Sequence, residues 1–151
     1  MLEMFYPQRY EVSAYVIPYD HYHAQGIRGV IFDVDNTLVP HDAPADGQAR
    51  ELFRHLHEMG METCLLSNNK EPRVKAFAED VGSAYIYKAG KPGTAGYGKA
   101  MERMGTDRGS TLFVGDQLFT DVYGANRAGI LSILVKPINP KEEIQIVLKR
   151  Y

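Results

Sequence analysis

A chain of 151 residues fits a single domain and is long enough to bury a substantial core. Its 17 Lys and Arg residues nearly balance its 19 Asp and Glu residues, so bulk charge gives no support for nucleic-acid binding. The single cysteine, Cys64, excludes a disulfide framework, the N-terminus lacks a signal-peptide pattern, and no apolar run approaches the roughly 20 residues of a membrane span. We therefore expect a cytoplasmic protein.

The first segment, residues 1–28, is rich in aromatic side chains. It holds six of the 16 in the chain, namely Phe5, Tyr6, Tyr10, Tyr15, Tyr19 and Tyr22. Tyrosine has an apolar body and a polar tip, so it suits surfaces that meet both protein and water or lipid headgroups. Two roles remain open. The rings either cover a face of the core or a subunit contact, or they lie beside a site and contact a bulky or lipidic ligand.

The stretch GVIFDVDNTLVP, Gly29 to Pro40, is predicted to begin with a buried strand, because Val30 to Phe32 form a continuous apolar run. Asp33 and Asp35 follow, two residues apart. Side chains at such spacing on a strand point the same way, and two neighbouring carboxylates resist ionisation unless a cation lies between them. The alternative is a simple turn, because Asp and Asn are common turn residues.

From residue 44 onward, helical and strand patterns alternate. Helices are predicted over 44–60, 71–82, 93–105 and 119–129, and strands over 61–69, 84–88, 110–116 and 130–137. Strictly alternating units of this kind imply an α/β fold, here a five-stranded parallel sheet with helices on both faces. We expect this core to span residues 29–137 and a helical tail to occupy residues 138–151.

Polar side chains follow four of the predicted strands. In open α/β sheets, ligands bind beyond the carboxyl ends of the strands. The residues predicted there are Asp33, Asp35, Ser67, Asn68, Asn69, Lys91, Asp116 and Asp121. Four apolar runs thus bring carboxylates, a hydroxyl with amides and an ammonium group to one edge, which favours a functional site over isolated turns.

The chemistry of these side chains indicates hydrolysis of a phosphate ester. Three acidic side chains with oxygen donors suit Mg²⁺, which prefers few protein ligands together with water and phosphate oxygens. The Ser67 hydroxyl and the Lys91 ammonium suit the oxygens of a phosphoryl group. One carboxylate can act as nucleophile, and a neighbouring one can protonate the leaving oxygen and then activate water.

Four motifs carry a resemblance to a known family. DVDNT at Asp33, SNN at Ser67, KP at Lys91 and GDQLFTD at Gly115 resemble the four ordered motifs of the haloacid dehalogenase (HAD) superfamily. The longer stretches GIRGVIFDVDNTL and GDQLFTDVYGANRAGILSILVKP resemble more narrowly the YqeG-like phosphatases of subfamily IIIA, which include relatives that act on phosphatidylglycerophosphate. The resemblance covers about residues 29–137 and implies a single Rossmann-like HAD domain.

The resemblance implies roles for the matching residues in the first motif. Asp33 would be the nucleophile and a Mg²⁺ ligand. Asp35 would be the general acid and base and would give its backbone carbonyl to the metal. Thr37 would support the loop and Asp35. Asn36 replaces the glycine that many members carry, which we do not interpret as loss of activity, because asparagine tolerates turn conformations.

The other three motifs receive roles in the same way. Ser67 would bind phosphate, and Asn68 would line the same pocket. Lys91 would hold phosphate and screen the nucleophile from its charge. Asp116 would complete the metal site, with Asp121 behind it or sharing its role.

The spacing leaves no room for a separate cap domain at the two places where HAD enzymes insert one. We therefore expect an open site suited to a bulky phosphoester, unless the N-terminal segment or a second subunit of a homo-oligomer covers it. In the tail, Ile144, Val147, Leu148 and Tyr151 have helical spacing beside Lys149 and Arg150, a pattern that would allow weak peripheral attachment to an anionic membrane.

Two other classes of protein have to be considered. A response-regulator receiver also accepts a phosphoryl group on Asp, but its acceptor ends the third strand, and the third strand here ends in AYIYKAGK, without an Asp. The second alternative is a catalytically silent binding module. All the positions that carry chemistry are filled, which favours an enzyme.

Overall fold

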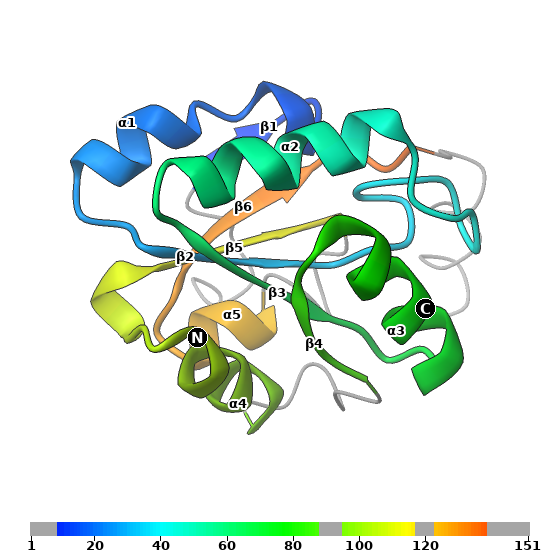
Figure 1. The fold of residues 1–151 in the computed structure, drawn as a ribbon. Helices are drawn as coiled ribbons and strands as arrows, with labels where there is room; N and C mark the ends of the chain where they lie inside the picture. Colours follow the sequence, from blue (N-terminus) through cyan, green and yellow to red (C-terminus); the bar gives the residue numbers. More distant parts are fainter. Residues whose placement is uncertain (1–8, 88–94, 117–122, 139–151) are drawn as a thin grey trace.

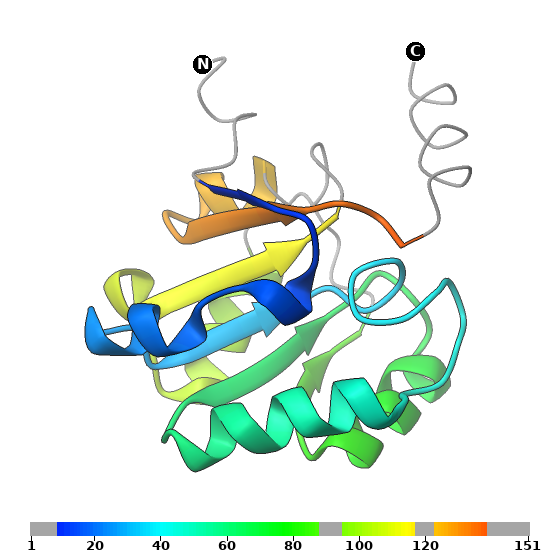
Figure 2. The same ribbon diagram turned by 90° about the horizontal axis from the view of Figure 1, so that it is seen from above.

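The computed structural model describes residues 9–87, 95–116 and 123–138. These residues form a six-stranded sheet in which every neighbouring pair of strands is parallel. The strands are β1 (Arg9–Glu11), β2 (Gly29–Phe32), β3 (Glu62–Leu66), β4 (Ala84–Ile86), β5 (Thr111–Gly115) and β6 (Leu131–Val135), in the order β1-β6-β5-β2-β3-β4. Figures 1 and 2 show the twist of this sheet. The predicted α/β fold is confirmed.

Helices cover both faces of the sheet, as predicted. They are the 3-10 helices η2 (Ala14–Val16) and η3 (Arg108–Ser110), and the α-helices α1 (Tyr19–Ala24), α2 (Gly47–Glu58), α3 (Glu71–Val81), α4 (Ala95–Met104) and α5 (Tyr123–Arg127). The helices η2, α1, α2 and α3 contribute buried side chains to one apolar cluster, and α4 and α5 contribute to a second. Figure 1 shows α1 and α2 on one side of the sheet and α4 and α5 on the other.

The number of strands differs from the expectation of five. The additional strand, β1, pairs with β6 at the edge of the sheet, with Tyr10 opposite Leu134. Its three residues, Arg-Tyr-Glu, are exposed or half-buried. Such a strand has no apolar run to reveal it, because one edge and much of its surface face water.

Helix boundaries follow local chemistry. The predicted helix over 44–60 begins at Gly47, because the Asp46 carboxylate accepts a hydrogen bond of 2.8 Å from the Ala49 amide as an N-cap. Helix α3 carries Pro72 in its first turn and ends at Gly82, whose φ of 74° is left-handed. None of the helices in the described parts of the chain has the length and apolar character needed to span a bilayer.

Candidate functional site

The central strands deliver three polar side chains to one edge of the sheet. Asp33, Ser67 and Asp116 come directly after β2, β3 and β5, which are neighbours in the order β5-β2-β3. After β2 the chain forms β3 and then β4 on one side of β2. It later forms β5 and then β6 on the other side, so the strand order reverses at β2. Ligand sites of open α/β sheets lie at such a point. All three side chains are buried.

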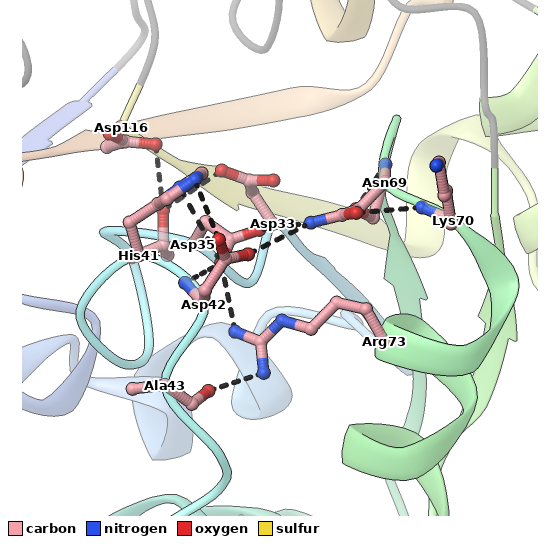
Figure 3. Close-up of polar contacts among 11 residues, drawn as sticks. Asp33, Asp35, His41, Asp42, Ala43, Asn69, Lys70, Arg73 and Asp116 are labelled. Carbon is pink, nitrogen blue, oxygen red and sulfur yellow. Dashed lines mark hydrogen bonds and ion pairs between the residues drawn. The ribbon is translucent and has the colours of Figure 1, made fainter.

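The Thr37 hydroxyl joins two of these carboxylates. Its oxygen lies 3.4 Å from Asp33 Oδ2 and 3.2 Å from Asp116 Oδ1, and the residue is buried. Because a hydroxyl carries one proton, it donates to one of the two carboxylates at a time. The structure therefore brings the carboxylates of the first and fourth motifs together, although they are 83 residues apart in sequence (Figure 3).

The loop after β2 is a tight turn. Asn36 has a φ of 63°, in the left-handed region that asparagine tolerates better than most residues. Its amide donates to the Val39 carbonyl at 2.8 Å, and its own carbonyl accepts from the Ile138 amide at 3.0 Å. The turn brings the Thr37 hydroxyl within 3.4 Å of Asp33 Oδ2.

Asp35 lies in a separate network of donors. Its Oδ1 accepts from the Asp42 amide at 2.8 Å and from Arg73 Nη2 at 2.9 Å, and its Oδ2 lies 3.4 Å from Asn69 Nδ2 (Figure 3). The His41 ring lies 3.9 Å from Oδ1. Burial alone would raise the pKa of the Asp35 carboxyl, but the Asp42 amide, the Arg73 guanidinium and Asn69 together hold it below its usual value. The carboxylate form is therefore favoured in this arrangement.

The second motif lies beside Asp35. Ser67 is buried, and its hydroxyl oxygen accepts a hydrogen bond of 3.0 Å from the Asn69 amide, which closes a turn at the end of β3. Asn68 is exposed. Asn69 reaches across to both Asp35 and Asp42, at 3.4 Å from one oxygen of each. The second-motif turn is thus tied to the first-motif loop.

Two of the expected site residues, Lys91 and Asp121, lie outside the described residues. The described part of the site therefore comprises Asp33, Asp35, Thr37, Ser67, Asn68 and Asp116. Sequence reasoning missed Arg73 and Asp42, which bind Asp35. Their only indication in the sequence is position, since Arg73 follows the SNN motif at the start of α3 and Asp42 follows the first motif.

The donor set at Asp33 and Asp116 fits a hard cation such as Mg²⁺. Two buried carboxylates share one hydroxyl, and only oxygen atoms are offered by these residues. A cation between them would relieve the repulsion of like charges. A second group, Asp35, His41 and Asp42, has ligand atoms within 4.8 Å of one another. In that group the Asp35 carboxylate is already engaged by N–H donors.

A parallel α/β sheet with buried carboxylates at its switch point suits the binding of a metal ion and a phosphoryl group. Comparisons with known proteins agree. The model of the haloacid dehalogenase-like hydrolases matches residues 41–129. The Bacillus subtilis protein named "Probable phosphatase YqeG" is 38% identical over 140 residues, 91% of this chain and 81% of that protein. The chain therefore belongs to the haloacid dehalogenase-like hydrolases and is a phosphatase of this type.

Two further similarities are more distant. Phosphatidylglycerophosphate phosphatase 1 of Arabidopsis thaliana, chloroplastic/mitochondrial, is 29% identical over 135 residues, which span 82% of this chain but 38% of that protein. A solved Legionella pneumophila hydrolase of HAD subfamily III A is 16% identical, with a TM-score of 0.60 over 80% of this chain and 71% of that chain. The latter supports the fold alone.

Proposed function

We propose that this chain hydrolyses phosphomonoesters with the help of Mg²⁺, through an aspartyl-phosphate formed on Asp33. The observation that carries the proposal is the Thr37 hydroxyl within reach of both Asp33 and Asp116, beside Ser67 at the switch point of the sheet. Asp33, Asp116 and the backbone carbonyl of Asp35 would hold the cation. Bound there, Mg²⁺ would neutralise charge on the transferring phosphoryl group.

The reaction is proposed to have two halves. An Asp33 oxygen attacks phosphorus while the bond to the leaving oxygen breaks, and the Asp35 carboxyl gives its proton to that oxygen. Water then attacks the aspartyl-phosphate, the Asp35 carboxylate takes a proton from it, and phosphate leaves with Asp33 restored. The donors around Asp35 favour its carboxylate form, which accepts the proton of water in the second half of the reaction. The negative charge of an incoming phosphate favours the protonated form of Asp35, which the first half requires.

The substrate is proposed to be bulky, with phosphatidylglycerophosphate as the leading candidate. The spacing of the motifs leaves no room for an inserted cap domain that would enclose a small metabolite, and one relative carries the name of a phosphatidylglycerophosphate phosphatase. A pocket of about 380 Å³ lies at the end of β4, the strand next to β3, and offers space and positive charge. Its lining residues are Glu71, Tyr85, Ile86, Tyr87, Lys99 and Arg103. The basic, amphipathic tail pattern supports a peripheral position at a membrane.

The test compares Asp33→Asn, Asp35→Asn and a matched control, Asp107→Asn. Asp107 caps η3, whose last residue precedes β5, so it lies at the opposite edge of the sheet. We expect Asp33→Asn to abolish phosphate release, Asp35→Asn to slow it about 10²- to 10⁴-fold, and Asp107→Asn to leave it unchanged. Circular dichroism and thermal melting establish that each variant is folded.

Phosphate release is measured from p-nitrophenyl phosphate and from phosphatidylglycerophosphate in mixed micelles, with Mg²⁺ or EDTA. The proposed mechanism requires that EDTA stops turnover and that added Mg²⁺ restores it. Full activity in folded Asp33→Asn would contradict it. A phosphorylated chain that never releases phosphate would instead indicate a phospho-accepting regulatory module. Preference for the small ester over the lipid would contradict the bulky substrate.

A further inference from the structure

The Arg73 side chain connects helix α3 to two points of the loop after β2. It starts in the first turn of α3, and its guanidinium donates from Nη2 to Asp35 Oδ1 at 2.9 Å and from Nη1 to the carbonyl of Ala43 (Figure 3). We propose that Arg73 is a positioning residue for the hydrolysis, because it holds the Asp35 carboxylate and the loop at residues 40–43 in working geometry. This inference rests on the proposed function.

The geometry of the contact suits an arginine. Its planar guanidinium offers several N–H groups in fixed directions, so one side chain can bind a carboxylate and a carbonyl at once. The guanidinium carbon lies 5.6 Å from the centre of the Phe77 ring, one helical turn along α3, which limits its freedom. The side chains of Arg73 and Asp35 are only 16% and 17% exposed, so water screens the pair weakly.

Among the donors to Asp35 that the structure describes, Arg73 is the one with a permanent positive charge. The Asp42 amide belongs to the same loop as Asp35, so it cannot anchor that loop to another element. Asn69 comes from the turn after β3, but its amide lies 3.4 Å from Asp35 and is shared with Asp42. Arg73 is therefore the strong link between the first-motif loop and α3, and through α3 to the rest of the domain.

A purely structural role explains this arrangement poorly. The Arg73 Nε atom is buried and has no hydrogen-bond acceptor among the described residues. A buried donor without an acceptor is costly, and a smaller apolar side chain on α3 would avoid that cost. An arginine here is understandable when one of its other nitrogens holds a reacting carboxylate and the second holds the loop beside it.

The experiment is a double-mutant cycle between Arg73→Ala and Asp35→Asn. Arg50→Ala is the matched control, because Arg50 likewise binds one aspartate, Asp80, and one loop carbonyl, of Ala45, but its ion pair is exposed and does not involve Asp35. The values kcat and KM are measured with p-nitrophenyl phosphate, a good leaving group, and with glycerol 3-phosphate, a poor one. Thermal melting accompanies each variant.

We expect Arg73→Ala to lower kcat for glycerol 3-phosphate by about 10- to 100-fold with little change in KM, the size typical of groups that orient a reacting residue. The loss should be smaller for p-nitrophenyl phosphate, whose leaving oxygen depends less on a proton from Asp35. Once Asp35 is Asn, Arg73→Ala should change kcat by less than about twofold. Arg73→Lys should recover part of the activity, and Arg50→Ala should match the wild type.

Several results would overturn the inference. Equal losses in the presence and absence of the Asp35 carboxylate would mean that Arg73 acts independently of it. A rise in KM alone would mean that Arg73 binds the substrate directly. A faster variant would mean that Arg73 restrains Asp35 rather than positioning it. If Arg73→Ala does not fold, Arg73→Lys completes the cycle. If the folded wild type hydrolyses neither of these esters nor phosphatidylglycerophosphate, the proposed function fails, and the inference fails with it. If it hydrolyses only the lipid, the same cycle is measured with the lipid.

Discussion

Replacing Thr37 by valine removes the hydroxyl between Asp33 and Asp116 and keeps the shape of the side chain. The hydroxyl donates to one carboxylate at a time, so the variant loses one charge-assisted hydrogen bond. Such a bond contributes about 1.5–3 kcal/mol, and distances of 3.2 and 3.4 Å favour the lower part of that range. A loss of about 2 kcal/mol lowers the melting temperature of a chain of this length by ~4–8 °C.

The assay is thermal melting with EDTA and with saturating Mg²⁺. We expect Mg²⁺ to reduce the difference between Thr37→Val and the wild type, because a cation at the two carboxylates replaces the lost donor. Thr111→Val is the control, since the buried Thr111 hydroxyl lies 2.8 Å from Thr106 Oγ1 and 2.6 Å from the Asp107 carbonyl, which are neutral groups. If Thr37→Val and Thr111→Val lower the melting temperature equally, and Mg²⁺ changes neither loss, the reasoning is refuted.

Two further predictions concern stability. Because the folded protein holds the pKa of Asp35 below its usual value, the ionised carboxylate stabilises the fold above about pH 4 and loses this effect as the pH falls through the folded value. Asp35→Asn should therefore lower the free energy of unfolding at pH 7. In denaturant titrations, the difference in this free energy between the variant and the wild type should shrink in acid, and a constant difference would contradict the prediction. Gly124→Ala should cost about 1–3 kcal/mol, because its Cβ would lie 2.7 Å from the hydroxyl oxygen of the buried Tyr97. Gly98→Ala, which meets nothing within 4 Å in helix α4, should stabilise slightly instead, and equal effects of the two alanines would count against the packing argument.

The sequence predicts the part of the site that lies directly at the carboxyl ends of the parallel strands. Asp33, Ser67 and Asp116 each follow an apolar run, and the carboxyl ends of parallel strands meet at one edge, so their proximity could be anticipated. The direction of Asp35 could not. The alternation of side chains holds only within a strand, and β2 ends at Phe32, before either aspartate.

The residues that bind Asp35 could not be predicted from the sequence either. Arg73 lies 38 residues from Asp35, and their contact depends on how the first turn of α3 faces the loop after β2. In a sequence, a charged residue in the first turn of a helix does not indicate a particular contact, because most such residues are simply exposed to water. The edge strand β1 escaped prediction for a related reason, because three polar or exposed residues carry no periodicity.

The aromatic N-terminal segment has the packing role, one of the two that its sequence left open, whereas contact with a ligand stays a prediction. Tyr19 and Tyr22 are buried in the core, so removing residues 1–22 would unfold part of the domain and could not isolate a role in substrate recognition. Tyr15, by contrast, donates a hydrogen bond of 2.6 Å to the Leu38 carbonyl, in the loop that carries Thr37. The segment therefore supports the loop from one side while Arg73 holds it from the other.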